Sequence, residues 1–177
     1  MKKCICIFFL FSMSKVTLCQ DVIINGANNN RLLTWDDFTG KPDKNSSHDA
    51  NTYWNLNYGF KGISFKGDTV KFTGISVKLE LNEKLSWIKQ GKQTNTLLKH
   101  EQGHFNIGLL CQLEVIKQFN STVFFMTDYQ SKIQAIFTAL LEKYRLLGVQ
   151  YDEETNHSKN QESQDSWNVF FTKELNK

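Results

Sequence analysis

The spacing of apolar residues changes partway along the chain, and this change constrains the fold more than any other feature. In the first half, apolar and polar residues alternate, most clearly at Trp54 to Phe60 and at Ile75 to Leu81. A period of two is typical of half-buried strands. In the second half the apolar spacing is helical, over Asn95 to Gln118, Thr127 to Leu147 and about Gln161 to Leu175. Strands followed by helices predict an α+β fold, with an N-terminal antiparallel β-sheet and a helical half.

Two details refine the expected sheet. Gly67-Asp68 lies between two strand-like segments and predicts a hairpin turn. The strand at Ile75 to Leu81 comes shortly before the first helix and could form a sheet edge that pairs with an extended peptide. An ordinary core strand is the alternative for this segment.

The first expected helix contains the run His100-Glu101-Gln102-Gly103-His104. Histidines four residues apart lie one turn apart on the same helix face, so both imidazoles can bind one metal ion, with the glutamate beside them. This pattern is the H-E-x-x-H signature of zinc hydrolases, in which the glutamate is the general base. The sequence therefore predicts Zn²⁺ bound by His100 and His104, with Glu101 as the catalytic residue. Two incidental helix histidines are the alternative.

The flanking residues support a single amphipathic helix around this motif. Thr94 or Asn95 is suited to cap its N-terminus. The histidines fall on a stripe beside the expected core stripe, where a cleft wall would lie. That core stripe consists of Leu98, Phe105, Leu109, Leu113 and Ile116.

The third zinc ligand is expected to be His157. If the second helix returns antiparallel to the first, it is again level with His104 near Glu142, and Tyr151 to His157 then emerges beside the histidine pair. Imidazole is the better zinc ligand in this segment, whereas Asp152 or Glu154 would orient a ligating histidine or serve as an alternative ligand. A solvated loop residue is the alternative for His157.

Other polar and aromatic residues have weaker assignments. Tyr144 or Tyr151 could donate a hydrogen bond to a developing oxyanion, although a ring packed in the core is the alternative for each. His48 lies in a polar loop and is expected to be solvated. Cys111 is expected to be a buried apolar residue, because it lies too far along the helix from His104 to share its ion.

Residues 1–19 predict a secretory signal peptide, because Lys2 and Lys3 precede a short apolar segment. Cleavage before Gln20 would leave one domain, residues 20–177, with no transmembrane segment and a secreted or periplasmic location. A lipoprotein acylated at Cys19 is the alternative. The formal net charge of +3 belongs to the leader, since the remainder has 18 basic and 18 acidic residues. This balance argues against nucleic-acid binding.

Four motifs in order along the chain resemble a bacterial family of predicted secreted zinc-dependent proteases, a domain of unknown function common in cell-envelope proteins of the Bacteroidetes. The motifs are Leu33 to Gly40, Ser86-Trp87, Leu98 to Phe105, and Tyr151 to Ser158 followed by Gln164 and Trp167. The resemblance implies a zincin-like metallopeptidase, although in that family too the activity is inferred mainly from the motif.

The function expected first is therefore a secreted zinc metallopeptidase that hydrolyses peptide or protein substrates with a zinc-activated water and Glu101 as base. A non-catalytic cell-envelope module with a structural or regulatory zinc site is the main alternative, since a closed four-ligand site would share the helix motif. An adhesin-like protein that keeps the peptidase scaffold is a third possibility. The sequence specifies neither the substrate nor the oligomeric state.

Overall fold

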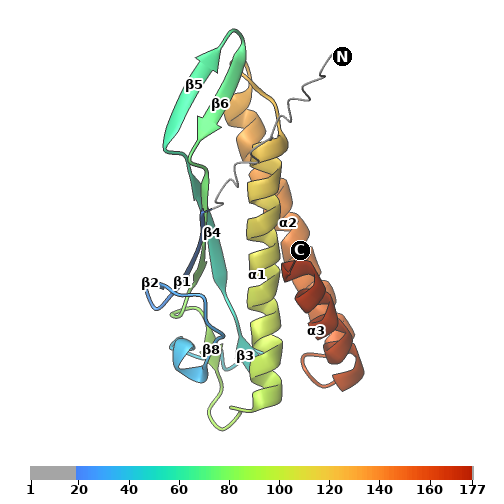
Figure 1. Ribbon diagram of the computed structural model, residues 1–177. Coiled ribbons are helices and arrows are strands. Elements are labelled where there is room, and N and C mark those ends of the chain that lie inside the picture. The colour runs from blue at the N-terminus through green and yellow to red at the C-terminus, as the bar shows by residue number, and fades with distance from the viewer. Residues whose placement is uncertain (1–18, 177) are drawn as a thin grey trace, which may run out of the picture.

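The computed structural model describes residues 19–176 and has the expected order of strands first and helices after (Figure 1). The helices are α1 (Asn95–Ser121), α2 (Tyr129–Thr155) and α3 (Gln161–Leu175). The α+β prediction is confirmed. Apart from Cys19, the expected signal peptide lies outside the described residues, so the signal peptide and the single-domain boundary stay predictions. Within the described residues, no helix is both long and apolar enough to span a membrane.

The main sheet has the strand order β2-β1-β7-β4 and is mixed rather than purely antiparallel. Its strands are β1 (Cys19–Ile24), β2 (Ala27–Asn28), β4 (Trp54–Gly59) and β7 (Ser76–Leu81). β7 pairs in parallel with β1 and antiparallel with β4, so both of its edges are occupied. Residues 75–81 therefore do not form a free edge for a peptide, and the alternative, an ordinary core strand, is confirmed. The reason is β1, a strand that local alternation did not reveal.

Two smaller sheets lie at opposite ends of the molecule (Figure 1). One pairs β3 (Ala50–Asn51) with β8 (Trp87–Ile88). The other has the order β5-β6-β9 and consists of β5 (Gly62–Lys66), β6 (Thr69–Thr73) and β9 (Phe124–Phe125). The hairpin turn expected at Gly67-Asp68 joins β5 to β6, and Gly67 has φ +60°, which suits glycine.

Helix α1 begins as predicted, because the Thr94 hydroxyl accepts a hydrogen bond from the Leu97 backbone N–H at 3.1 Å. It packs between the main sheet on one side and α2 and α3 on the other (Figure 1). Its buried surface is consequently wider than one stripe. Ile107 and Val115 are buried although they lie outside the expected stripe, whereas Leu98 and Leu109 are only half-buried.

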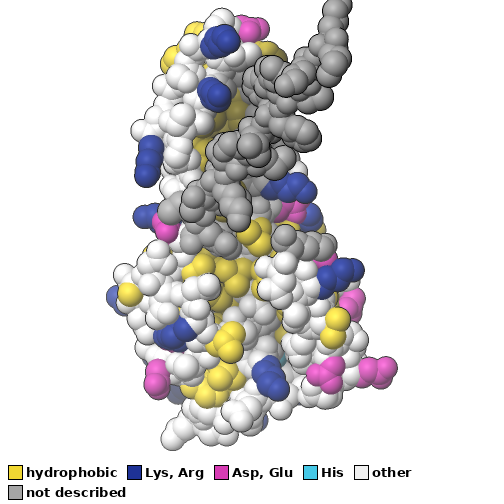
Figure 2. Space-filling model, viewed as in Figure 1, with side chains coloured by type: hydrophobic (Ala, Val, Ile, Leu, Met, Phe, Trp, Pro, Cys, Tyr) yellow, Lys and Arg dark blue, Asp and Glu magenta, His cyan; other side chains and the backbone are white. Residues whose placement is uncertain are grey.

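The surface seen in Figure 2 has apolar side chains gathered along its middle and charged side chains toward its margins. The buried polar residue Gln112 joins α1 to the main sheet, since its side-chain amide donates to the backbone oxygens of Asp21 and Val77 at 2.9 and 2.8 Å. These bonds satisfy the amide in the core, as burial of a polar group requires.

Helix α2 extends eight residues past its expected end at Leu147, to Thr155. Burial of Tyr151 and Thr155 stabilises the extra turns, and the left-handed Asn156, with φ 46°, ends the helix. The residue level with His104 is Gly148 rather than Glu142, because a Cβ added at Gly148 would lie 3.9 Å from Nδ1 of His104. The segment Tyr151 to Thr155 is therefore part of the helix and not a loop after it.

Candidate metal centre

The N-terminal part of α1 and the last turn of α2 bring three donor atoms together. Nε2 of His100 and Nε2 of His104, both on α1, lie 3.3 Å apart. Oδ1 of Asp152, near the end of α2, lies 3.0 Å from each of these nitrogens. Asp152 thus lies directly at the histidine pair, in the segment from which the sequence analysis expected a ligand.

The turn after α2 adds a fourth donor atom. Asn156, His157 and Ser158 all have positive φ values, and this left-handed turn directs the chain back toward the cluster. Nδ1 of His157 lies 3.2 Å from Oδ1 of Asp152, is itself buried, and makes no hydrogen bond within the described residues. The ligand atoms of His100, Asp152 and His157 all lie within 4.8 Å of one another, so this group could hold a metal ion.

The separations of the donor atoms fit one small cation. In a tetrahedral zinc site with bonds of about 2.0–2.1 Å, neighbouring ligand atoms are roughly 3.3 Å apart. The separations among His100, His104 and Asp152, and between Asp152 and His157, run from 3.0 to 3.3 Å, whereas the group within 4.8 Å that includes His157 does not include His104. A buried ring nitrogen without a hydrogen bond is also costly unless something satisfies it. The residues present therefore fit a bound metal ion.

The electrostatics keep a negative charge at the centre of this group. Burial by itself would raise the pKa of Asp152, but the neighbouring imidazoles of His100 and His104 outweigh it and hold that pKa well below its usual range. Burial by itself would lower the pKa of His104, but Asp152 and Glu101 outweigh it and raise the pKa. An ionised carboxylate among three imidazoles is a donor set that transition-metal ions such as zinc accept.

Glu101 lies beside the cluster and has a separate partner. Its side chain is buried, and its Oε2 accepts a hydrogen bond from the Thr52 hydroxyl at 2.6 Å. Thr52 follows β3, so this bond joins the β3 segment to α1. Glu101, His100, His104 and Asp152 all line one cleft of about 780 Å³, and Tyr53 and Trp54 line it too.

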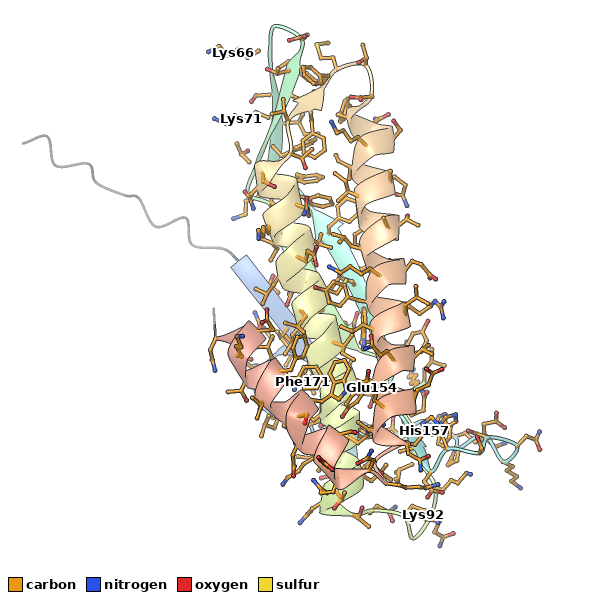
Figure 3. All side chains as sticks on the ribbon, turned by 90° about the vertical axis from the view of Figure 1, so that its right-hand side faces the viewer. Lys66, Lys71, Lys92, Glu154, His157 and Phe171 are labelled. Carbon is orange, nitrogen blue, oxygen red and sulfur yellow. The ribbon has the colours of Figure 1, made fainter. Side chains whose placement is uncertain are left out.

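The remaining predicted site residues lie near the cluster but have other partners. The Glu154 carboxylate accepts hydrogen bonds from Trp167 and Gln150, so it belongs to the α2–α3 contact and not to the metal-binding group. Figure 3 shows Glu154 on α2 and His157 in the turn that follows. The Tyr144 hydroxyl donates to Glu114 at 2.7 Å, and the Tyr151 hydroxyl donates to the His100 backbone oxygen at 3.1 Å. Both hydroxyls therefore already donate to other partners, although Tyr144 also lines the cleft.

Sequence reasoning missed three residues at this site. His48 was expected to be solvated, but its ring lies 4.2 Å from that of His157, between centroids, and it lines the cleft. Thr52 carried no local signal, because its contact with Glu101 spans 49 positions. Gln164 bonds to Nδ1 of His100 at 3.2 Å, and only its place in the family resemblance marked it.

Comparison with known protein families gives one match. A family model described as a bacterial protein of unknown function (DUF922) matches residues 24–158, a segment that includes His100, Glu101, His104, Asp152 and His157. Neither the curated proteins nor the solved structures include a significant match. The matched segment covers most of the chain, and the chain therefore belongs to this bacterial family of unknown function.

Proposed function

We propose that the protein is a secreted zinc-dependent metallopeptidase. The observation that carries this proposal is Glu101, a buried carboxylate that lines the same cleft as the histidine pair and is held there by Thr52. A site that only binds metal has no use for this group, whereas hydrolysis needs a base beside the metal. The export of the protein rests on the expected signal peptide.

His100, His104 and Asp152 would hold the zinc ion, since their donor atoms have mutual distances of 3.0 to 3.3 Å. Nδ1 of His157 lies 3.2 Å from the same oxygen, Oδ1 of Asp152. The sequence favoured His157 over Asp152 because imidazole is the commoner ligand, whereas the distances to both helix histidines favour Asp152. Zinc bound there would make a coordinated water more acidic and polarise the scissile carbonyl.

The protein's own groups would then carry the proton transfers. Glu101 would accept a proton from the attacking water and donate it to the leaving amine. The Thr52 hydroxyl would hold one oxygen of Glu101, which leaves the other for the proton. Tyr144 and Tyr151 receive no role in this proposal because their hydroxyls already donate to Glu114 and His100.

The cleft supports a peptide substrate. Tyr53 and Trp54 lie on one wall, and large aromatic side chains are common anchors in recognition sites. Arg145 and Lys92 line the same cleft beside the acidic Asp49 and Asp152, so neither sign of charge dominates. This mixed lining suits a peptide chain better than a polyanion.

A specific observation favours a second candidate function, a cell-envelope module with a structural or regulatory zinc ion. Four donor atoms, one each from His100, His104, Asp152 and His157, are available, and a metal bound to all four would have no position for a reacting water. In that case the carboxylate of Glu101 would be dispensable.

Incubation of the mature protein with a library of peptides, with and without a chelator, tests the two functions. The peptidase predicts cleavage that the chelator abolishes and added zinc restores. Glu101→Gln should retain zinc and lose roughly 10²- to 10⁴-fold in rate, because an amide cannot accept the proton. Zinc binding by a protein that cleaves no peptide in the library would favour the envelope module.

A further inference from the structure

A chain of buried hydrogen bonds runs from α3 to the imidazole of His100. Its members are Tyr151, Gln164 and Thr155, and all three side chains are buried. None of them lies within hydrogen-bonding distance of the other donor atoms at the centre of the cluster. Gln164 and Thr155 contact Nδ1 of His100, the ring nitrogen that does not face Asp152, and Tyr151 bonds to Gln164.

The direction of each bond follows from groups that can act in only one way. The Tyr151 hydroxyl has one proton to donate and two acceptors at 3.1 Å, the backbone oxygen of His100 and Oε1 of Gln164. The Tyr151 oxygen accepts from the side-chain NH₂ of Gln164 at 2.7 Å. The same NH₂ group also donates to Oδ1 of Asn168 at 3.2 Å.

This orientation turns the amide oxygen of Gln164 toward His100. Oε1 of Gln164 lies 3.2 Å from Nδ1 of His100, and a carbonyl oxygen can only accept. The Thr155 hydroxyl donates to the Tyr151 backbone oxygen at 2.6 Å and therefore presents a lone pair to the same Nδ1 at 3.4 Å. Two acceptors at one ring nitrogen require that this nitrogen carries the proton.

The proton at Nδ1 determines what Nε2 can do. In a neutral imidazole with a proton on Nδ1, Nε2 carries a lone pair. That lone pair faces Oδ1 of Asp152 at 3.0 Å and Nε2 of His104 at 3.3 Å. These separations suit a cation or a proton held among the three atoms, and the lone pair of His100 is then free to bind a metal ion.

We propose that Gln164, supported by Tyr151 and Thr155, is a positioning residue that holds His100 as its Nδ1–H tautomer and so presents Nε2 as a metal ligand. This inference rests on the metal site of the proposed function but concerns a different helix. Gln164 lies on α3, beyond residue 158 where the family match ends. Helix α3 is accordingly part of the metal centre, although no α3 side chain reaches the ion.

Zinc affinity, measured by competition with a chromophoric chelator, tests this role. Gln164→Leu removes the acceptor at nearly constant volume and should weaken zinc binding roughly 10- to 100-fold, as loss of a group that orients a ligating histidine does. Gln164→Glu keeps an oxygen at the same place and should stay within about threefold of the parent. Gln112→Leu is the matched control, because it makes the same change at a buried glutamine that bonds Asp21 and Val77 instead.

A nitrogen-15 NMR spectrum of the metal-free protein tests the tautomer directly. In the neutral imidazole, His100 should carry its proton on Nδ1 in the parent and show a mixture of tautomers in Gln164→Leu. A proton on Nε2 in the parent would overturn the proposal. So would parent-like zinc affinity in Gln164→Leu, or an equal loss in Gln112→Leu. If the parent protein binds no zinc, the proposed function is wrong. The NMR spectrum of the metal-free protein would still decide the role of Gln164.

Discussion

The two ends of the molecule are built from different interactions. At the end that holds β3 and the start of α1, several buried side chains are polar: His100, Glu101, Thr155 and Gln164 all lie there and all have hydrogen-bond partners. At the opposite end, β5, β6 and β9 meet the helices through a cluster of rings. In Figure 3, His157 and Lys92 mark the first end, and Lys66 and Lys71 mark the second.

The aromatic cluster shows what packing alone does. Phe60 stacks on Phe72 with centroids 4.3 Å apart, and Phe72 meets Phe124 edge to face at 5.2 Å. Tyr58 packs edge to face on Phe119 and Phe137. We call the end with the aromatic cluster the ring end and the end with the buried polar groups the polar end. The hydrophobic stabilisation gained by burying these rings is non-directional, whereas at the polar end each donor must meet an acceptor. We expect substitutions at the ring end to change stability, and substitutions at the polar end to change metal binding or the catalytic rate.

The largest effect is expected at the third ligand. Asp152→Ala should weaken zinc binding by several orders of magnitude because it removes the atom nearest to both helix histidines. His157→Ala should cost at least tenfold. Glu154→Ala should bind zinc as the parent does, since its carboxylate faces Trp167. Zinc titration of the three variants ranks them. A larger loss for His157→Ala than for Asp152→Ala would make His157 the ligand.

The ring end should respond in stability alone. Phe72→Ala should lower the free energy of unfolding by about 3 kcal/mol through lost burial and a residual cavity, and leave zinc affinity unchanged. Phe65→Ala on the neighbouring strand is the control, because Phe65 is 56% exposed and should cost far less. Urea denaturation of zinc-free protein measures both. A change in zinc affinity in Phe72→Ala would show that the two ends are coupled.

An acid-dependent contribution to stability is expected at the polar end. Burial by itself would raise the pKa of Asp37, at the end of the 3₁₀ helix η1 (Trp35–Asp37), but Arg31 and Thr34 outweigh it and lower that pKa. A lowered pKa contributes stability above the unfolded value of about 3.9, and this stability is lost as pH falls toward the folded value.

Asp37→Asn should therefore cost about 2 kcal/mol near pH 7, the scale of a hydrogen bond to a charged group. The difference from the parent should shrink as pH falls below about 4. Urea midpoints of both proteins across this range provide the measurement. A difference that does not vary with pH would mean that Asp37 acts through shape and not through charge.

The smallest effect concerns the support of Glu101. Thr52→Val removes the hydroxyl that donates to Oε2 and should lower kcat about tenfold with little change in KM, which corresponds to about 1.4 kcal/mol. Thr52→Ser should restore the rate, since the hydroxyl returns. Zinc affinity should be the same in all three proteins. A Thr52→Ser variant as slow as Thr52→Val would assign the effect to packing of the lost methyl group.

Local patterns predicted the features that depend on near neighbours in the chain. The Gly67-Asp68 turn, the Thr94 cap and the extent of α3 each follow from a few adjacent residues, and each was predicted. The i, i+4 spacing of His100 and His104 likewise brought both nitrogens to one point, because a helix turn fixes their relation.

The predictions that failed concern places where segments distant in the sequence pack together. The second helix was expected to end at Leu147, but burial of Tyr151 and Thr155 against α1 and α3 carries it through Gly148 to Thr155. This extension moves Asp152 onto the histidine pair and directs Glu154 toward Trp167, two residues and roughly 200° further around the helix. Apolar spacing could not reveal the extension, because the burial depends on partners elsewhere in the chain.

The sequence by itself determined the α+β order, the strand and helix periods, and the paired histidines with their glutamate, because these depend on contacts within a few residues. Only the tertiary structure decided that β7 is an interior strand, that Asp152 joins the histidines, and that Thr52 and Gln164 hold Glu101 and His100. Those contacts join positions 48 to 64 residues apart at the site. The packing of α1 against the sheet, α2 and α3 creates them, and no local pattern encodes that packing.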